Sequence, residues 1–569
     1  MESQRLISSE SLDIPRPEGI DQDEEDFHTG RYSDLEHPSS QGQDVPQDGD
    51  EDENDDVTNA KVVLVVAALT ATSFLVMLDM SILPTAIPQI TTEFHSLGDI
   101  GWFGSAYLLA SSTMQPLTGK LYLRFGLKAS QQLQYTFLTF LTVFELGSLL
   151  CGIAPSSKLF ILARAVAGLG ASGLLNGALS IIAAIAPMHK RPALIGFMLL
   201  IGQLGMVGGP VLGGLLMKYA GWRWCFYINL PIGAVSAIIL SSLYIPDGFI
   251  RSTAKTKLAV FFSLDPIGFV LFTAFTVTLF MTLQWGGSIY EWMSPVIIGL
   301  LGASILLFTL FAGWERFVVG ENAMFPYSML RKRVVWASCL TIFLLQGCAL
   351  IYLYYLPMYF QSVKGTSPLS SGVYNSPGIG SQMLLAAVSG VLVGRMGYYL
   401  PWVLASGMLG LVGSVLMSTL TPETSPAAWI SYQVIAGIGR GCGTTMPMVA
   451  TQNILSPEQI PLGMSLVAFC QSFGGSMFLM FAQAIFSYSL VDGLKRFAPT
   501  VDIPTVIDAG AAGLRDVVQP GELPGVIKAY NLSFTREFYL AAVAYIAMIF
   551  SAWGMGWYSV KKQKGGSRD

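Results

Sequence analysis

Apolar runs of about 20 residues, separated by short polar or turn-rich breaks, recur along the chain from residue 62 onward. A helical run of this length matches the hydrocarbon thickness of a bilayer, so each run predicts a transmembrane helix. The pattern therefore predicts an all-α membrane protein with fourteen transmembrane helices. The fourteen runs are 62–88, 102–122, 130–153, 158–183, 193–218, 224–246, 263–285, 294–316, 334–361, 372–395, 401–420, 428–451, 460–489 and 537–559.

A set of short motifs occurs twice in the chain, with about 270 residues between the two copies. The matched segments are 119–126 with 390–397, 164–170 with 433–439, and 83–84 with 356–357. Matches in the same order at a nearly constant spacing predict two equivalent helix bundles related by a pseudo-two-fold axis. Paired repeats in a chain with many spans are typical of secondary transporters.

The repeat groups the predicted spans into two six-helix bundles with two inserted helices between them. Four regions complete this organisation: a tail at each end, the inserted pair, and a long loop in the second bundle. The predicted boundaries are 1–60 (tail), 61–246 (first bundle), 263–316 (inserted pair), 334–560 (second bundle, with the loop at 490–535) and 561–569 (tail).

Charge is distributed very unevenly along the chain. Residues 1–57 carry 19 acidic residues and three arginines, a net charge of −16, although all 569 residues together carry only −5. This stretch has few aromatic or β-branched residues that could form a core, so it predicts a disordered tail. Only 12% of the chain is charged, against about a quarter in a soluble domain, which excludes an ordinary soluble protein.

Lysine and arginine gather in alternate short loops, after the second, fourth, sixth, eighth and tenth predicted spans. Because cytoplasmic loops are enriched in these residues, both termini are expected in the cytoplasm and the loop 490–535 outside. That loop carries a glycosylation sequon at Asn531, very close to the last predicted span.

Ionisable residues inside spans cost about 3 kcal/mol or more each, so they are candidates for function. In the first bundle, Asp79, Glu145 and Arg164 are expected at one depth, roughly 10 Å from the outer ends of their helices at 1.5 Å per residue. Such a cluster could exchange a proton, because the arginine favours an ionised carboxylate and desolvation disfavours it. A static buried ion pair that fixes the helix register is the alternative reading.

The second bundle has lost these charges and keeps the glycines of the repeat. Gln433 takes the position of Arg164, and Tyr352 that of Asp79. We therefore expect proton chemistry in the first bundle and substrate contacts in the second. The candidate substrate-binding residues are Tyr352, Tyr355, Gln433, Arg440 and Gln471.

The fifth predicted span contains Gly205, Gly209 and Gly213 at intervals of four residues, and Pro210 lies directly after the second of them. This spacing predicts a groove for close helix packing, and the proline predicts a bend. We interpret these four residues as a gating bend, with simple packing as the alternative for the glycines. The sequence shows no catalytic His/Asp or Ser/His constellation and no metal-type cysteine spacing, so we expect no enzyme, cofactor or metal site.

These motifs resemble the major facilitator superfamily over nearly the whole chain after the tail. They look like its fourteen-span drug:proton antiporter family, in the fungal toxin and multidrug efflux branch. The segments that carry the resemblance are 78–88, 119–128, 164–173, 202–214, 222–233, 283–287 and 355–361. The resemblance implies a conformational role for Gly119, Arg124 and Gly126 in the loop motif, which usually has an aspartate where this chain has Leu123.

The resemblance implies a proton-coupled antiporter that exports a small amphipathic compound by alternating access. The expected partners are this small molecule, protons and the lipid bilayer, without nucleic acid, and the chain is expected to be a monomer in the plasma membrane. A vacuolar carrier of basic amino acids or siderophores is the alternative within transport. A membrane receptor is a more distant alternative, because the short acidic tail is a poor signalling domain.

Overall fold

The computed structural model describes residues 49–126, 130–185, 191–242, 265–286, 290–320, 323, 325, 327–456 and 459–559. Residues 56–569 form one compact unit, to which the following description applies. Apart from two isolated bridges, these ranges contain no β-structure. The all-α prediction is confirmed for the part of the chain that is described.

The first half of the chain contributes seven α-helices and one short 3-10 helix within the described ranges. They are α1 (Gly49–Phe94), η1 (Leu97–Asp99), α2 (Ile100–Gly126), α3 (Ser130–Ile153), α4 (Ser157–Ile185), α5 (Arg191–Tyr219), α6 (Trp224–Tyr227) and α7 (Asn229–Ser242).

The rest of the described chain continues through the inserted pair into the second half. These elements are α9 (Pro266–Trp285), α10 (Pro295–Gly313), the π-helical turn η2 (Trp314–Val319), α11 (Tyr327–Leu330), α12 (Arg333–Ser362), α13 (Pro368–Met396), α14 (Leu400–Met417), α15 (Pro426–Gly443), α16 (Met446–Ile454), α17 (Ile460–Phe497), α18 (Ile503–Val517), α19 (Leu523–Ala552) and η4 (Trp553–Met555).

Local sequence signals set several helix ends. α10 and α13 begin with a serine followed by proline, and the hydroxyls of Ser294 and Ser367 each accept a hydrogen bond from a backbone N–H in the first turn. α13 ends at Gly397, which has a φ of +85° and closes the helix in the left-handed conformation. The glycine at the end of the second copy of the loop motif therefore acts as a helix stop.

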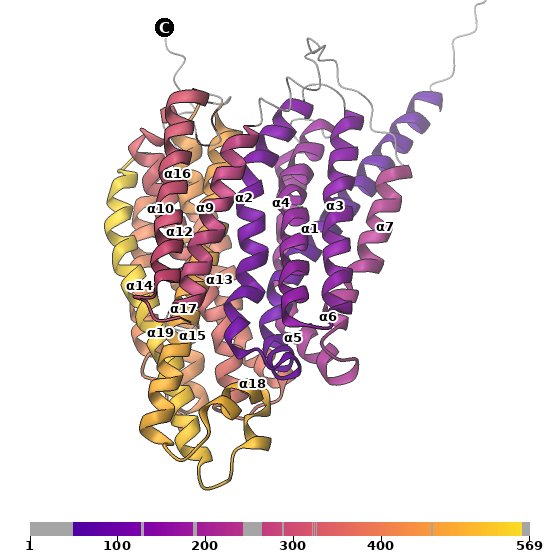
Figure 1. Cartoon of the computed structure of the whole chain (residues 1–569). Coiled ribbons are helices and arrows are strands. Elements are labelled where there is room, and N and C mark those ends of the chain that lie inside the picture. Colours follow the sequence, from indigo (N-terminus) through magenta and orange to yellow (C-terminus); the bar gives the residue numbers. More distant parts are fainter. Residues whose placement is uncertain are drawn as a thin grey trace, which may run out of the picture. The chain divides into compact units, whose positions relative to one another are not determined.

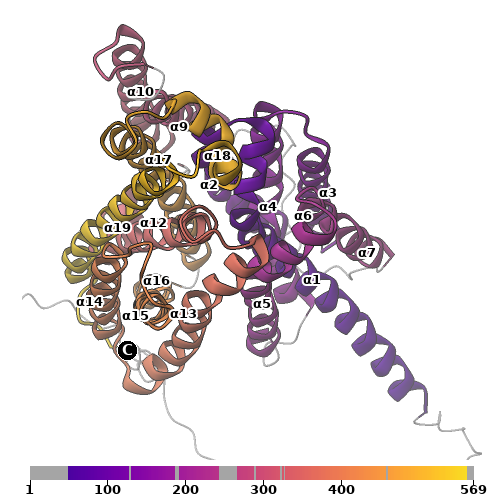
Figure 2. The ribbon, with the colours of Figure 1, turned by 90° about the horizontal axis from the view of Figure 1, so that it is seen from below.

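The helices form two groups, α1–α7 and α12–α19, coloured indigo to magenta and crimson to yellow in Figures 1 and 2. In the first group α4 packs on α2 and α3, and α7 packs on α3. In the second group α12, α17 and α19 pack on one another, α14 packs on α19 and α15, and α15 also packs on α13. The two groups meet along two helix pairs, α2 with α17 and α5 with α13.

Twelve helices among the described residues are long and apolar enough to cross a membrane. The other two predicted spans, 102–122 and 428–451, coincide with α2 and with the α15–α16 pair. α2 carries polar residues such as Thr118, which bonds to Ser172 on α4. A turn at Thr444 and Thr445 divides the second predicted span into two helices. The inserted pair is present as α9 and α10, which pack on each other.

Two predicted boundaries are wrong. α1 begins at Gly49, so residues 49–60 of the predicted disordered tail are helical, and the acidic residues there favour a helix N-terminus. The predicted loop 490–535 is much shorter, because α17 continues to Phe497, α19 begins at Leu523, and α18 occupies most of the space between them. Residues 1–48 and 560–569 lie outside the described residues.

Candidate functional site

A fully buried ion pair lies between α1 and α4. Arg164 Nη1 donates to Asp79 Oδ2 at 2.7 Å, and the two side chains are 1% and 0% exposed. The Arg164 Nε also donates to the backbone oxygen of Phe103 on α2, at 3.2 Å. The structure thus brings together two of the three residues that the sequence placed at one depth.

Helices α3 and α7 complete the surroundings of this pair. Asn229, at the start of α7, points its amide nitrogen at the other Asp79 oxygen, at 3.5 Å, and at the Ser148 hydroxyl on α3, at 3.1 Å. The Arg164 guanidinium lies over the ring of Tyr107, 4.4 Å from its centroid. Five helices therefore contribute to the surroundings of the ion pair, and the arginine is held by an ion pair, a backbone oxygen and an aromatic face.

Glycines of the motif at 164–170 allow this convergence. A Cβ atom on Gly168 would lie 2.1 Å from the backbone oxygen of Tyr107 on α2, and one on Gly170 would lie 2.3 Å from the backbone nitrogen of Phe144 on α3. The glycines therefore let α4, which carries Arg164, pack closely on both α2 and α3.

Glu145 lies near this pair and is not part of it. Its two carboxyl oxygens are buried and have no hydrogen-bond partner among the described residues, although it lies within electrostatic range of Asp79. A Cβ atom on Gly233 of α7 would lie 1.8 Å from the Glu145 Oε1. Gly233, in the segment 222–233, thus makes room for this carboxyl.

In the second half, Tyr352 and Arg440 lie together. The Tyr352 hydroxyl is 2.7 Å from the Ser414 hydroxyl, and the Arg440 guanidinium lies 4.5 Å from the centroid of the Tyr352 ring. Arg440 Nε donates to Gln382 at 2.9 Å, and no acidic side chain of the described residues forms an ion pair with it. Tyr352, which takes the position of Asp79 in the repeat, therefore contacts a cation through its ring.

The other three candidate substrate residues are distributed over two places. Gln433 lies near Arg440, because both approach within 3.4 Å of a Cβ position on Gly378. Tyr355 donates to Gln483 at 3.3 Å, and Gln471 donates to Gln346 at 3.3 Å, both on the α12–α17 contact. The structure therefore groups Tyr352, Gln433 and Arg440, and places Tyr355 and Gln471 elsewhere.

The glycine stripe of α5 packs against α1. A Cβ atom on Gly209 would lie 1.9 Å from the Ser81 hydroxyl, and one on Gly205 would lie 2.6 Å from the backbone oxygen of Phe74. A Cβ atom on Gly213 would lie 2.9 Å from the Ile82 side chain. The groove predicted from the four-residue spacing is thus filled by the helix that carries Asp79.

Two glycines outside the predicted set close the contact between α5 and α13. A Cβ atom on Gly214 would lie 2.4 Å from Leu369 Cα, and one on Gly372 would lie 2.1 Å from the backbone oxygen of Pro210. Pro210 therefore lies where the two halves touch. Sequence reasoning passed over both glycines because their partners are about 150 residues away and no local spacing indicates them.

The loop motif ends α2. A Cβ atom on Gly119 would lie 3.0 Å from the Ser465 side chain on α17, so this glycine lies at the contact between the two groups of helices. Gly126 is the last residue of α2. The side chains of Leu123 and Arg124 lie outside the described residues, so the predicted conformational role of Arg124 stays a prediction.

Further contacts join the two groups at the end where α5 ends and α13 begins, which we call the closed end. Gln361 of α12 donates to the backbone oxygen of Thr85 at 3.2 Å, and the Thr92 hydroxyl donates to the backbone oxygen of Ala509 on α18 at 3.0 Å. Arg515 of α18 donates to the backbone oxygen of Val363 at 3.3 Å. α18 therefore bonds to the last turn of α1 and to the end of α12.

Asp99 lies at the same end and accepts a hydrogen bond from Ser157. Burial raises the pKa of the Asp99 carboxyl, and the Ser157 hydrogen bond opposes this shift in part. Asn531 lies inside α19, where its amide nitrogen donates to the backbone oxygen of Leu420 at 3.0 Å. A glycan at this position would displace that contact, and glycosylation of Asn531 stays a prediction.

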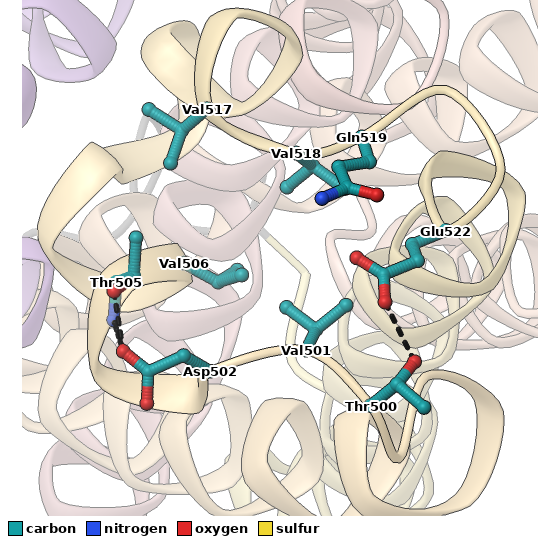
Figure 3. A pocket seen from close by; sticks show the side chains of 9 residues that line it. All are labelled: Thr500, Val501, Asp502, Thr505, Val506, Val517, Val518, Gln519 and Glu522. Atoms are coloured by element: carbon teal, nitrogen blue, oxygen red, sulfur yellow. Dashed lines mark hydrogen bonds between the residues drawn. The ribbon is translucent and has the colours of Figure 1, made fainter.

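A hollow of about 250 Å³ lies beside α18, as Figure 3 shows. Both acidic side chains on its wall are engaged locally: Asp502 accepts from the backbone nitrogen of Thr505 at 3.3 Å, and Glu522 accepts from the Thr500 hydroxyl at 2.6 Å. None of the predicted site residues lines it. The hollow is therefore separate from the candidate site.

Multiple candidate spans around a buried polar centre define a multi-pass helical membrane protein. A family model described as the Major Facilitator Superfamily matches residues 69–479. The chain belongs to this superfamily, whose members are transporters.

The chain is 50% identical over 518 residues to "Efflux pump mlcE" of Penicillium citrinum, covering 90% of this chain and 93% of that protein. It is 38% identical over 514 residues to "Aspyridones efflux protein" of Neocamarosporium betae, covering 89% of each. These relatives place it with the efflux transporters for fungal metabolites.

A similar fold is found in a solved bacterial homologue of the human lysosomal transporter Spinster, in an inward-facing and unoccupied conformation. The TM-score is 0.60 at 16% identity, with 89% of this chain and 99% of that chain covered. This likeness confirms the fold.

Proposed function

We propose that this transporter is a proton-coupled antiporter that exports a small amphipathic organic compound by alternating access. The observation that carries the proposal is the Asp79–Arg164 pair, which is fully buried at 2.7 Å. An ionisable pair so deep in a membrane protein is expensive, and proton relays are a common reason for its presence. Asn229, whose amide nitrogen also donates to Ser148, gives the carboxylate a further polar contact that does not depend on the arginine.

We further propose fourteen spans in two six-helix bundles related by a pseudo-two-fold axis. The repeat equates α2 with α13 and α5 with α17, so the contacts α2–α17 and α5–α13 are exchanged by such an axis. Gly168 and Gly437, equivalent in the repeat, lie against α2 and α13 respectively. α2 and the α15–α16 pair would then cross the membrane with the twelve more apolar helices.

The proposed orientation has both termini in the cytoplasm of a plasma-membrane protein that works as a monomer. The closed end then faces outward, because α1 would leave the cytoplasm and end at Phe94. Since Tyr352, Gln433 and Arg440 are at most 4% exposed, this conformation would have to open before a substrate could reach them. In this proposal they line the substrate path of the second half.

The function can be tested with inside-out membrane vesicles from cells that express the chain. An inside-acidic pH gradient should drive uptake of aspyridones, chosen because a relative carries that name, and a protonophore should abolish the uptake. A panel of basic amino acids and ferric siderophores in vacuolar and plasma-membrane vesicles tests the alternative carrier. Uptake that ignores the pH gradient for every compound would contradict proton coupling.

The closed end offers a test of alternating access. A cysteine pair that replaces Thr92 and Ala509 should form a disulfide under mild oxidation, because the two residues are in hydrogen-bond contact. The disulfide should block export almost completely, since it ties α18 to the last turn of α1. Reduction should restore export.

Each single cysteine variant serves as a control for oxidation. The six native cysteines are buried, except Cys470, which is half-buried, so background cross-linking should be low. Unchanged export by the fully cross-linked protein would contradict opening at this end.

A further inference from the structure

Glu537 is a buried acid that the sequence interpretation missed. It lies in the middle of α19, its side chain is 0% exposed, and neither carboxyl oxygen has a hydrogen-bond partner among the described residues. The neighbouring Arg536 points elsewhere, to Ser489 at 3.2 Å and Asp492 at 3.4 Å. The acid and the adjacent base therefore do not form a pair.

No basic side chain of the described residues forms an ion pair with Glu537. The basic residues on the helices packed against α19 lie at helix ends, Arg333 at the start of α12 and Lys495 and Arg496 in the last turn of α17. α19 packs on α12, α14, α17 and η4, and neither α14 nor η4 contains a titratable side chain. On α12, Tyr355 lies within electrostatic range of Glu537. On α17 the nearby acid Asp492 is held by Arg536 at the more exposed end of the helix.

A carboxylate in such a place would be an uncompensated buried charge, which is strongly unfavourable. Asp79 is the opposite case, because Arg164 and Asn229 stabilise its charged form. We propose that Glu537 is protonated in this conformation and serves as a second proton-binding residue, located in the half that was expected to hold only substrate contacts. This inference rests on the proposed proton-coupled function.

Polar side chains connect the surroundings of Glu537 with the closed end. Tyr355 donates to Gln483, whose amide nitrogen donates in turn to Ser487 at 3.0 Å and to the backbone oxygen of Leu97 at 3.4 Å. Leu97 belongs to the first half of the chain, so opening of the closed end would break this connection. Water could then reach the carboxyl, accept its proton and leave a solvated carboxylate.

Infrared spectroscopy of the purified full-length protein in lipid nanodiscs tests the protonation. The spectrum at pH 7 should contain the C=O stretching band of protonated carboxyl groups. Glu537→Gln should remove one carboxyl's share of that band. Asp79→Asn should leave it unchanged, because the Asp79 carboxylate is paired with Arg164. Thr535→Val controls for substitution at a neutral buried position of α19. An undiminished band in Glu537→Gln would overturn the proposal.

The proton-binding role is tested by the pH dependence of cross-linking between positions 92 and 509 in the Thr92→Cys/Ala509→Cys protein, which needs no substrate. One linked proton changes a conformational equilibrium by at most about tenfold per pH unit. Glu537→Gln should lower the slope of the cross-linking rate against pH by up to this amount. Thr535→Val should leave that slope unchanged. The cross-linking rates are compared after correction for thiolate content with a small thiol reagent.

The outcomes separate this proposal from the function on which it rests. A reduced band with an unchanged pH slope would make Glu537 a structural acid and overturn its role in proton binding. If cross-linking in the Thr92→Cys/Ala509→Cys protein does not depend on pH, and vesicle uptake does not depend on the pH gradient, proton coupling itself is contradicted. If Asp79→Asn abolishes proton-driven uptake and Glu537→Gln keeps it, the proposed function stands and Glu537 has no part in it.

Discussion

Asp79→Asn should abolish uptake driven by a pH gradient, while exchange of the cargo down its own gradient persists. Asparagine keeps the shape of the side chain, and its single amide oxygen can still accept from Arg164, but it does not titrate. Because Asp79 receives donors from two helices, we expect the cargo site to stay assembled. The measurement is uptake into inside-out vesicles with and without the gradient, normalised to the amount of protein.

A purely static ion pair predicts a different result for this variant. Loss of one partner of a buried pair costs about 3–5 kcal/mol, because the other charge remains uncompensated. Protein abundance should then fall, while the surviving molecules couple to protons normally. Normal pH-dependent uptake per surviving molecule in Asp79→Asn would therefore end the assignment of Asp79 as a proton carrier.

Arg164 provides the matched comparison. Arg164→Lys keeps a positive charge, although it loses the planar group that bonds to Phe103 and stacks on Tyr107. It should retain part of the gradient-driven uptake, and Arg164→Ala should lose nearly all of it. Equal activities of the two variants would show that the charge at this position is not used.

The Asp79–Arg164 pair could be predicted from the sequence because a buried charge in a membrane span is strongly unfavourable without a partner. A charge in the middle of an apolar span needs a partner, and helical rise places Asp79 and Arg164 at one depth. The same argument grouped Glu145 with them, and the structure leaves Glu145 without a hydrogen bond beside Gly233. Depth alone does not say which face of a helix a side chain occupies.

The prediction of Asp79 and the omission of Glu537 both depend on the depth in the membrane at which the sequence interpretation placed each charge. The sequence interpretation started the last span at residue 537, where a charge would lie at the membrane surface and cost little. α19 begins at Leu523 instead, so fourteen residues of helix precede Glu537. The apolar positions Tyr530 and Phe534, which are fully buried, were the available signal for the earlier start.

The contacts of neutral polar residues, and contacts between helices far apart in the chain, could not be predicted from the sequence. Asn229 carries no charge, so its place beside Asp79 left no mark in the hydropathy pattern. The contacts of Gly214 with Leu369 and of Gly372 with Pro210 join helices that are far apart in the chain. The repeat predicted equivalent bundles, and it contained no information on how closely they approach each other.

Gly209→Leu should abolish export while the protein still inserts into the membrane. Any side chain at this position meets α1, since a Cβ atom would already lie 1.9 Å from the Ser81 hydroxyl and 3.0 Å from the backbone nitrogen of Ile82. Separating two tightly packed helices costs roughly 1–3 kcal/mol, and the shift would carry Asp79, two residues before Ser81, away from Arg164. Export and surface level should be measured in the same cells.

The neighbouring glycine makes this test specific. A Cβ atom on Gly208 would have nothing within 4 Å, so Gly208→Ala should retain export, whereas Gly209→Ala should already reduce it. Both substitutions lower the flexibility of α5 in the same way, and only one of them presses on α1. Equal export by the two alanine variants would contradict a role for the close packing of α5 on α1 at Gly209.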